Sequence, residues 1–347
     1  MGSETQAVPD SGVPAHPTVM RAIVQDAYGS ADVLRLEETD KPAIAANEVL
    51  VKVHAAGLDR GTLHLLTGKP YLMRIMGFGF RRPKNRVPGL DVAGTVVAVG
   101  PDVTRFKTGD EVFGIAKGSF AEFAAARQDK LAIKPAGLSF EQAAVVPISG
   151  LAAIQALRDG GHIEAGQEVL IIGASGGVGT YAVQLAKAYG VDVTGVCSTG
   201  KVDLVRSIGA DHVLDYTRDA YLGGARRYDL IIDIGGNNRT SRLRKALTPK
   251  GTLVIVGGEE GGDVTGGFGR SLRAPLLSLF VRQRLTMQVT KETYTDLQPL
   301  SEFIEAGKVT PVIDKVYPLA EVPDALRSLE AGDVRGKIAV AIGEDDG

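Results

Sequence analysis

Several features that mark particular protein classes are missing from this sequence. Its 347 residues include one cysteine, Cys197, and no tryptophan. A single cysteine cannot close an intrachain disulfide or build a cysteine-rich zinc lobe. No segment approaches the roughly 18–20 consecutive apolar residues that a membrane-spanning helix needs. We therefore expect neither a disulfide scaffold nor a transmembrane protein.

An excess of charge of one sign is missing as well. The chain has 39 Lys and Arg against 41 Asp and Glu, which gives a formal net charge of -2. Nucleic-acid-binding proteins usually carry a basic excess, so we expect no nucleic-acid partner. Hydrophobic residues make up 44% and charged residues 23% of the chain. This mix is ordinary for folded proteins and excludes disorder of the whole chain.

Glycine, by contrast, is abundant. The chain has 44 glycines, about twice the usual share, so many tight turns and close backbone approaches are expected. The length fits two domains of roughly 100–200 residues each. Residues 1–19 are polar and rich in proline, without a basic start or an apolar stretch. They predict a disordered leader rather than a secretory signal, and a cytoplasmic location follows as the default.

The pattern of the chain changes near residue 147. Residues 20–146 predict short strands separated by turns, such as Glu48–His54 and Val92–Val99, which is typical of a partly closed β-barrel. Residues 147–290 alternate strands such as Glu168–Gly173 with helices such as Val178–Tyr189. Because these strands are apolar throughout, we expect an α/β domain with a doubly wound parallel sheet that is covered on both faces.

The last segment, residues 291–347, is too small to fold alone. It predicts two helices and a strand, namely Tyr294–Gly307, Pro323–Glu330 and Lys337–Ile342. We expect this segment to return to the first domain and complete it.

A glycine-rich turn carries the strongest chemical signal. It follows the apolar strand and opens a helix, and a second strand follows about twenty residues later, which is the context of a dinucleotide-binding site. Its small residues allow a tight turn, and its N–H groups with the helix N-terminus attract a pyrophosphate. The candidate cofactor residues here are Gly173, Ala174, Ser175, Gly176, Gly177, Val178 and Gly179.

The end of the second strand indicates which dinucleotide binds. An NAD site usually has an acidic residue there, which holds the ribose 2′-hydroxyl. This strand ends at Cys197-Ser198 with no carboxylate, and Lys201 follows. Asp192 lies at the beginning of the strand, which is the wrong end of the sheet. A hydroxyl and an ammonium suit a 2′-phosphate, so we predict NADPH as the cofactor.

Motifs along nearly the whole chain resemble one enzyme family. They are NEVLVKV at Asn47–Val53, PGLDVAGTV at Pro88–Val96, GDEVF at Gly109–Phe113 and GASGGVG at Gly173–Gly179. From Arg21 to Ile342 the chain resembles the medium-chain dehydrogenase/reductase superfamily, and within it the zinc-independent quinone oxidoreductase-like reductases. The resemblance implies a GroES-like barrel, completed by the C-terminal segment, beside a Rossmann domain.

The same resemblance implies a function and further site residues. In quinone oxidoreductases a lysine and a tyrosine fifteen residues apart hold the 2′-phosphate, and Lys201 and Tyr216 have this separation. The expected activity is NADPH-dependent hydride transfer to a small-molecule acceptor, a quinone or an α,β-unsaturated carbonyl. Two alternatives remain open, an alcohol or aldehyde oxidoreductase and a redox-inactive NADPH-binding protein.

Zinc does not fit the corresponding positions. Zinc alcohol dehydrogenases have a cysteine and a Gly-His-Glu motif where this chain has Asp59 and Leu90-Asp91. Leucine cannot ligate a metal, so we expect no stoichiometric metal, even though zinc-dependent names are common in this family.

The catalytic residues are predicted less directly. A general acid near the acceptor oxygen would help reduction of a carbonyl, and Tyr71 and Asp59 are the catalytic candidates. His64 lies in an apolar stretch and is expected to pack. Ala152 replaces a threonine that is usual in the family, which removes one expected contact near the nicotinamide.

A basic segment, Phe268–Met287, includes Arg270, Arg273, Arg282 and Arg284. It predicts a flap over the cofactor cleft rather than a membrane-surface helix, and we expect no membrane partner. The strand Arg284–Thr290 that follows is expected to lie at a sheet edge and to pair with a second subunit in a homodimer.

Overall fold

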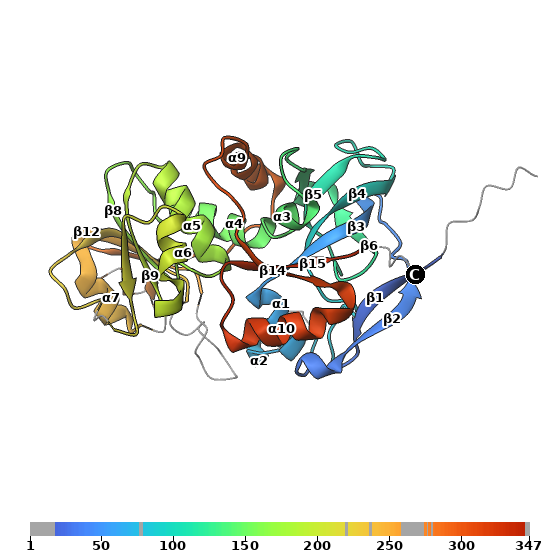
Figure 1. The fold of residues 1–347 in the computed structure, drawn as a ribbon, viewed down its shortest axis with the longest axis horizontal. Coiled ribbons are helices and arrows are strands. Elements are labelled where there is room, and N and C mark those ends of the chain that lie inside the picture. Colours follow the sequence, from blue (N-terminus) through green and yellow to red (C-terminus); the bar gives the residue numbers. More distant parts are fainter. Residues whose placement is uncertain are drawn as a thin grey trace, which may run out of the picture.

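The computed structural model describes residues 18–343, apart from 76–78, 219–220, 236–237, 258–273, 276 and 279. Two β-sheets lie side by side, with α3 (Phe140–Ala144) and α4 (Pro147–Gln155) between them (Figure 1). One sheet is parallel and flanked by helices, and the other belongs to the β-rich part of the chain. The predicted fold class, a Rossmann domain beside a GroES-like barrel, is confirmed.

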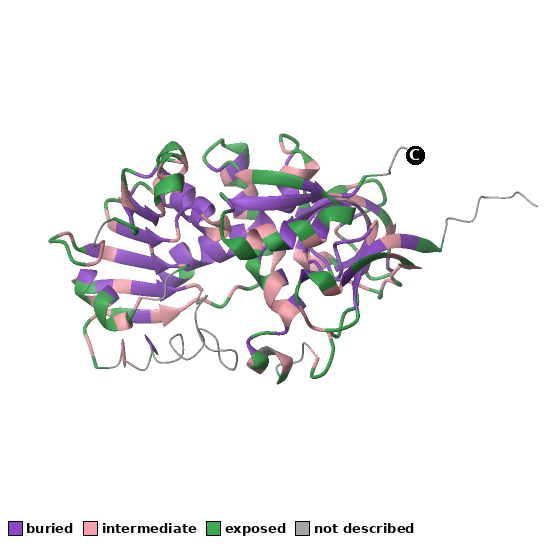
Figure 2. Cartoon of the chain, turned by 60° about the horizontal axis from the view of Figure 1, so that its bottom comes forward, coloured by how far each residue is buried: buried purple, intermediate pink, exposed green. Residues whose placement is uncertain are grey.

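The parallel sheet has six described strands in the order β10-β9-β8-β11-β12-β13. The central strand, β8, buries its side chains on both faces. Val169 and Ile171 belong to one hydrophobic core, and Leu170 belongs to another. Figure 2 shows the strands of this sheet as mostly buried. The strands are β8 (Glu168–Ile172), β9 (Asp192–Cys197), β10 (His212–Asp215), β11 (Tyr228–Asp233), β12 (Leu247–Ile255) and β13 (Arg284–Met287), and the helices are α5 (Gly177–Ala188), α6 (Val202–Ser207) and α7 (Thr240–Ala246).

The other large sheet has the order β14-β15-β3-β4-β5-β7, and β6 pairs with β3. Its β15 pairs with β3 through Ala339 and Gly57, so the C-terminal segment lies beside an early strand. A separate hairpin is formed by β1 (Val19–Gln25) and β2 (Leu34–Asp40). The strands of the large sheet are β3 (Glu48–Leu58), β4 (Asp91–Val99), β5 (Glu111–Ile115), β6 (Phe123–Arg127), β7 (Leu131–Ile133), β14 (Ile313–Pro318) and β15 (Lys337–Ala341).

Several local expectations need correction. Val19 begins β1 and pairs with Asp40, so the predicted leader 1–19 is wrong at its last residue. The strand β14 was not predicted, because its exposed residues hide the alternation of a half-buried strand. The predicted flap with Arg270 and Arg273 lies largely outside the described residues.

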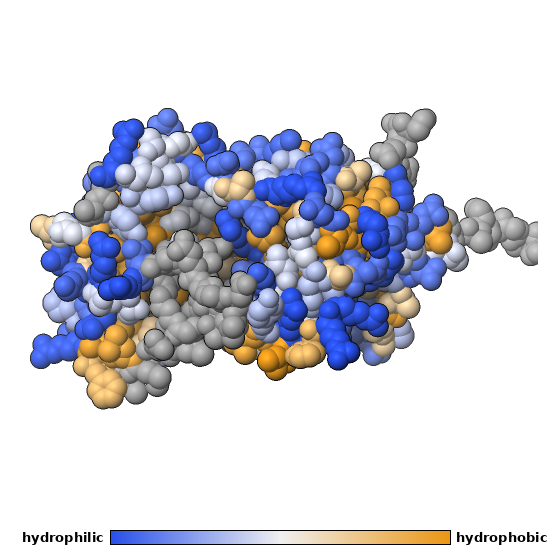
Figure 3. All heavy atoms as spheres, turned by 90° about the horizontal axis from the view of Figure 1, so that it is seen from below, coloured by the Kyte–Doolittle hydropathy of each residue, from blue (hydrophilic) through white to orange (hydrophobic). Residues whose placement is uncertain are grey.

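The C-terminal segment also contributes α9 (Tyr294–Glu305) and α10 (Val322–Ala331). Seen from below, the described surface is mostly hydrophilic, and its apolar residues form separate groups (Figure 3). No helix in the described parts of the chain has the length and apolar character that crossing a membrane requires.

Candidate active site

The glycine-rich turn between β8 and α5 has the shape that a pyrophosphate site requires. Gly173 has φ +89°, a left-handed conformation that favours glycine. A Cβ on Gly179 would lie 2.0 Å from the carbonyl oxygen of Gly173, so α5 packs directly on the turn. Gly176 caps α5, and the nearest atom that a Cβ there would meet is 3.6 Å away. The helix N-terminus therefore faces space in which an anion fits.

The start of β15 packs against this turn. The backbone N–H of Gly336 donates a 2.8 Å hydrogen bond to the carbonyl oxygen of Ser175. A Cβ on Gly177 would lie 2.9 Å from Cδ of Lys337. The cofactor loop and the barrel sheet therefore meet at the last strand of the chain.

The predicted 2′-phosphate residues come together at the carboxyl ends of β9 and β10. Tyr216 follows β10 and donates its backbone N–H to the carbonyl oxygen of Cys197 at 3.1 Å, next to Ser198. Lys201 donates from Nζ to the carbonyl oxygens of Gly332 and Val334 at 2.8 and 2.9 Å. Its ammonium is thus anchored to the turn after α10, and burial lowers the pKa of Lys201.

Arg335 was missed by the sequence analysis. Its Nη2 donates to the carbonyl oxygen of Gly200 at 2.7 Å, and its guanidinium lies close enough to Lys201 to lower the pKa of that ammonium. Arg60 acts on Lys201 in the same direction. Three cations therefore lie near the end of β9, and the carboxylates of Asp333 and Asp314 act on Lys201 in the opposite direction. Because Arg335 is 135 positions from Gly200 in the chain, no local pattern pointed to it.

A carboxylate does lie nearby, on the neighbouring strand: Asp215 is the last residue of β10. It accepts hydrogen bonds from the hydroxyls of Thr199 and Thr217 at 2.5 and 2.7 Å, and the bond from Thr199 is the main reason that the pKa of Asp215 is lowered. Each of these hydroxyls takes up an acceptor position of the Asp215 carboxylate.

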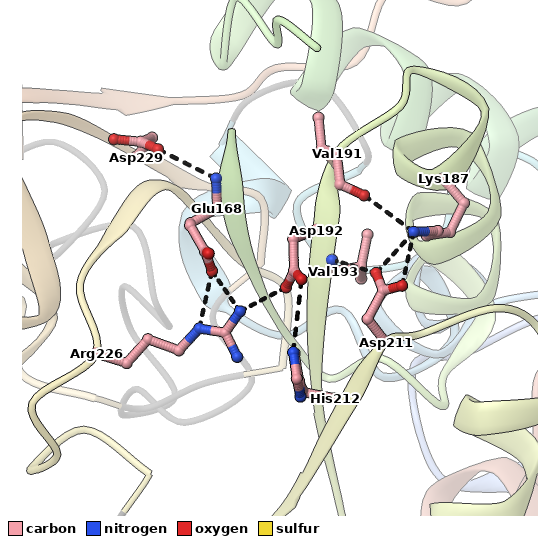
Figure 4. A network of polar contacts seen from close by, with 9 residues as sticks. All are labelled: Glu168, Lys187, Val191, Asp192, Val193, Asp211, His212, Arg226 and Asp229. Atoms are coloured by element: carbon pink, nitrogen blue, oxygen red, sulfur yellow. Dashed lines mark hydrogen bonds and ion pairs between the residues drawn. The ribbon is translucent and has the colours of Figure 1, made fainter. Parts of the chain in front are cut away.

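Asp192 lies at the opposite end of the sheet, as the sequence predicted. It begins β9 and is paired in register with Glu168, the first residue of β8. Its carboxylate contacts Arg226 at 2.6 Å and His212 at 3.5 Å, as Figure 4 shows. The glycine-rich turn follows the other end of β8, so Asp192 cannot hold the cofactor ribose.

The predicted catalytic candidates have different environments. Asp59 is buried at the start of α1 (Arg60–Thr67), where Oδ1 accepts the N–H of Thr62 at 2.9 Å. Tyr71 begins α2 (Tyr71–Met73), is 41% exposed, and has the Arg74 guanidinium 4.8 Å from its ring centre. His64 lies 3.0 Å from the carbonyl oxygen of Lys69 through Nδ1, a local structural contact.

A buried pair of ionisable residues, Asp91 and Lys337, was not predicted from the sequence. Asp91 is fully buried, and its Oδ2 lies 3.5 Å from Nζ of Lys337, which is 2% exposed. Oδ1 accepts the N–H of Ile148 at 3.0 Å. Burial raises the pKa of Asp91 to about 8, although the ammonium of Lys337 opposes this shift.

Zinc does not fit this region. Leu90 offers no ligand atom, and the ammonium of Lys337 beside Asp91 would repel a cation. The described residues contain no group of three or more His, Cys, Asp or Glu that could hold a metal ion.

We therefore predict that protein purified without chelators or added metal contains no stoichiometric zinc. Elemental analysis measures this directly. About one zinc per chain, removed together with activity by a chelator, would contradict the prediction.

Comparisons with known proteins identify the family. Residues 45–156 match the alcohol dehydrogenase GroES-like domain, and residues 208–340 match a family described as zinc-binding dehydrogenase. The chain is 34% identical to the mouse mitochondrial NAD(P)H oxidoreductase RTN4IP1, over 94% of this chain and 90% of that protein. The chain belongs to the medium-chain dehydrogenase/reductase superfamily.

Two further comparisons narrow the branch of this superfamily. The chain is 34% identical to the chloroplastic NADPH-dependent alkenal/one oxidoreductase of Arabidopsis thaliana, over 93% of this chain and 80% of that protein. The quinone oxidoreductase of Coxiella burnetii superposes with a TM-score of 0.82 at 28% identity, covering 94% of this chain and all of that one. This medium-chain reductase is therefore an oxidoreductase of the zinc-independent, quinone oxidoreductase-like branch, and it uses a nicotinamide cofactor.

Proposed function

We propose that this medium-chain reductase transfers hydride from NADPH to a quinone or an α,β-unsaturated carbonyl without zinc. The main support is the group of cations and hydroxyls at the ends of β9 and β10. Lys201 and Arg335 lie there, and the nearby carboxylate Asp215 is occupied by two threonine hydroxyls. A 2′-phosphate gains charge-assisted hydrogen bonds from the cations in such a place.

In this mechanism, different residues of the chain bind different parts of the cofactor. NADPH, when bound, supplies the hydride from its nicotinamide ring. The N–H groups at the start of α5 stabilise the pyrophosphate, and the close packing of Gly179 on Gly173 fixes their direction. Lys201, Ser198 and Tyr216 bind the 2′-phosphate together with Arg335. Holding the acceptor against the nicotinamide supplies much of the rate enhancement for a quinone.

The names of the relatives favour a quinone or an α,β-unsaturated carbonyl as the acceptor. One relative is named for alkenals and enones, and a structural neighbour is named for quinones. A panel of quinones, alkenones and aldehydes, followed by NADPH oxidation, tests this proposal. Turnover with aldehydes alone would support the alcohol or aldehyde alternative, and tight NADPH binding without turnover would support a redox-inactive protein.

The cofactor preference gives a direct prediction. Lys201→Ala is expected to weaken NADPH binding on the order of tenfold, because one charge-assisted hydrogen bond is lost from a partly exposed site. NADH binding should change little, since NADH lacks the 2′-phosphate. Titration with both cofactors measures the two dissociation constants.

Lys187→Ala is the matched control, because Lys187 pairs with Asp211 at the far end of α5. The assignment of Lys201 fails if wild type prefers NADH or if Lys201→Ala weakens both cofactors equally.

We also propose a homodimer that forms through the edge of the parallel sheet. The observed strand is β13, which ends at Met287 rather than at the predicted Thr290, and within the described residues it pairs with β12 alone. Its outer backbone groups can pair with a second copy. Light scattering should give twice the chain mass. A monomeric mass at high protein concentration would contradict this proposal.

A cytoplasmic location also stays a proposal. The mouse and Arabidopsis relatives are named as mitochondrial and chloroplastic. A small-molecule acceptor, rather than a nucleic acid or a membrane, is the proposed partner.

A further inference from the structure

Three buried polar atoms near the cofactor loop have no hydrogen-bond partner. They are Oδ2 of Asp59, Oδ2 of Asp91 and Nζ of Lys337. The three residues are 8%, 0% and 2% exposed, and the last two atoms are 3.5 Å apart. Buried polar atoms normally have partners, because an unpaired one is costly. Such a group therefore suggests a task beyond stability. We call Asp59, Asp91 and Lys337 the buried triad.

The charges of the buried triad do not balance. Two carboxylates and one ammonium leave one negative charge in an interior that disfavours it. One bound proton removes the imbalance. Burial raises the pKa of Asp91 to about 8, and Asp59 adds to this shift while Lys337 opposes it. At neutral pH the triad therefore holds one exchangeable proton, on Asp91.

The polar groups that act on Asp91 come from several elements. Lys337 comes from β15, Asp59 follows β3, and α4 contributes the N–H of Ile148. The remaining titratable group is Tyr181 of α5, whose hydroxyl donates to the carbonyl oxygen of Val145 at 3.2 Å. Burial and the charge of Asp91 raise the pKa of Tyr181, so its phenol keeps its proton.

The buried triad also connects the two halves of the site. The side chain of Lys337 lies in the space that a Cβ on Gly177 of the cofactor loop would fill. Asp59 caps α1, the helix that precedes Tyr71. Of the three members, Asp59 is the most accessible to solvent. The charge of Asp59 acts on Asp91, and Asp59 begins the helix that leads to Tyr71, so Asp59 is the member from which a proton would leave toward the barrel loop.

Reduction of a conjugated carbonyl consumes one such proton. The hydride forms a new C–H bond on the acceptor as the C–H bond at C4 of the nicotinamide breaks, and the oxygen or α-carbon of the acceptor then takes a proton. We propose that the buried triad supplies this proton. The O–H bond of Asp91 breaks, the proton passes through Asp59 to the reduced acceptor, and Asp91 remains as a carboxylate beside Lys337 until solvent returns a proton. This inference rests on the proposed function. Asp91 acts through Asp59 rather than on the acceptor itself, and Lys337 is a positioning residue.

Asp91→Asn tests the proposal, because the amide keeps the size of the side chain and an oxygen for Ile148. With an alkenone acceptor, the rate of wild type should be constant below about pH 8 and fall above it as Asp91 loses its proton. Asp91→Asn should lower the plateau on the order of 10²-fold and remove the fall, since a general acid contributes at least this much. Asp203→Asn is the matched control, because Asp203 is fully exposed on α6.

Infrared spectroscopy tests the same group without turnover. Wild type at neutral pH should show the absorption of a protonated carboxylic acid, and Asp91→Asn should lack it while Asp203→Asn keeps it. If Asp91→Asn fails to fold, Asp59→Asn, whose amide oxygen still caps α1, tests the same route through the pH profile.

The outcomes separate this inference from the proposed function. A reductase that keeps its plateau and its pH dependence in Asp91→Asn would overturn the inference alone. The inference would also be overturned if the infrared spectrum of wild type lacked a protonated-carboxyl absorption that Asp91→Asn removes. If no quinone or alkenone oxidises NADPH, the proposed function is wrong. The proposed proton transfer to the acceptor is then wrong as well, even if the infrared band is present.

Discussion

Gly179→Ala is expected to abolish tight NADPH binding and to lower the free energy of unfolding by about 1–3 kcal/mol, the usual cost of overpacking. The added Cβ would lie 2.0 Å from the carbonyl oxygen of Gly173, and both atoms belong to backbone that cannot rotate away. The start of α5 must then move away from the turn, and its N–H groups no longer point toward the pyrophosphate. Cofactor titration and denaturant unfolding measure the two effects.

Gly176→Ala is expected to weaken NADPH binding without changing the stability of the free protein. Its Cβ would meet the carbonyl oxygen of Gly173 at 3.6 Å, an ordinary contact, so the stability of the free protein should not change. The methyl group does narrow the space in front of α5, so NADPH binding should still weaken. If Gly179→Ala binds NADPH as wild type does, or if both variants destabilise the protein equally, the assigned roles are wrong.

Lys337→Met is expected to destabilise the protein strongly at high pH and little at low pH. Removing one partner of a buried ion pair costs about 3–5 kcal/mol, because the other charge is left uncompensated. The pKa of Asp91, about 8, lies above its ordinary value of 3.8, so the folded state binds this proton more tightly than the unfolded chain does. Stability from this group is fully present below pH 3.8 and is lost as the pH rises toward 8.

In Lys337→Met the loss of stability with rising pH should extend to higher pH, because the ammonium no longer stabilises the carboxylate of Asp91. Denaturant unfolding at about pH 5 and about pH 9 compares the protonated and ionised states. The double variant Asp91→Asn, Lys337→Met should recover most of the lost stability at high pH. An equal loss at both pH values would show that Lys337 acts through packing rather than through charge.

The cofactor loop could be predicted from sequence because its signals are local. A buried strand, a run of small residues and a helix follow one another within Glu168–Ala188, and each constrains the next. The choice of NADPH depended on Ser198 and Lys201, which stand close to the loop in the fold and in the chain. Strand β14 was missed because most of its side chains are exposed, so neither apolar continuity nor alternation marked it.

The contacts that complete the site depend on the tertiary fold. Arg335 meets Gly200, and Lys337 meets Asp91, only because β15 pairs with β3 and begins beside the cofactor loop. Asp215 was overlooked for a related reason. Its position at the end of β10 is visible in the sequence, but its hydrogen bonds to Thr199 and Thr217 depend on how β9 and β10 pair.

The hydrogen bond between Gly336 and Ser175 has a consequence for biosynthesis. The ribosome makes the glycine-rich turn well before its backbone partner, Gly336. Strand β3 is also made early, and it can pair with β15 only after that later strand has been made. A nascent or truncated chain that stops before Gly336 therefore has an unsupported cofactor loop and an open barrel sheet. Both halves of the site therefore depend on β15, so NADPH binding requires a chain that extends past this strand.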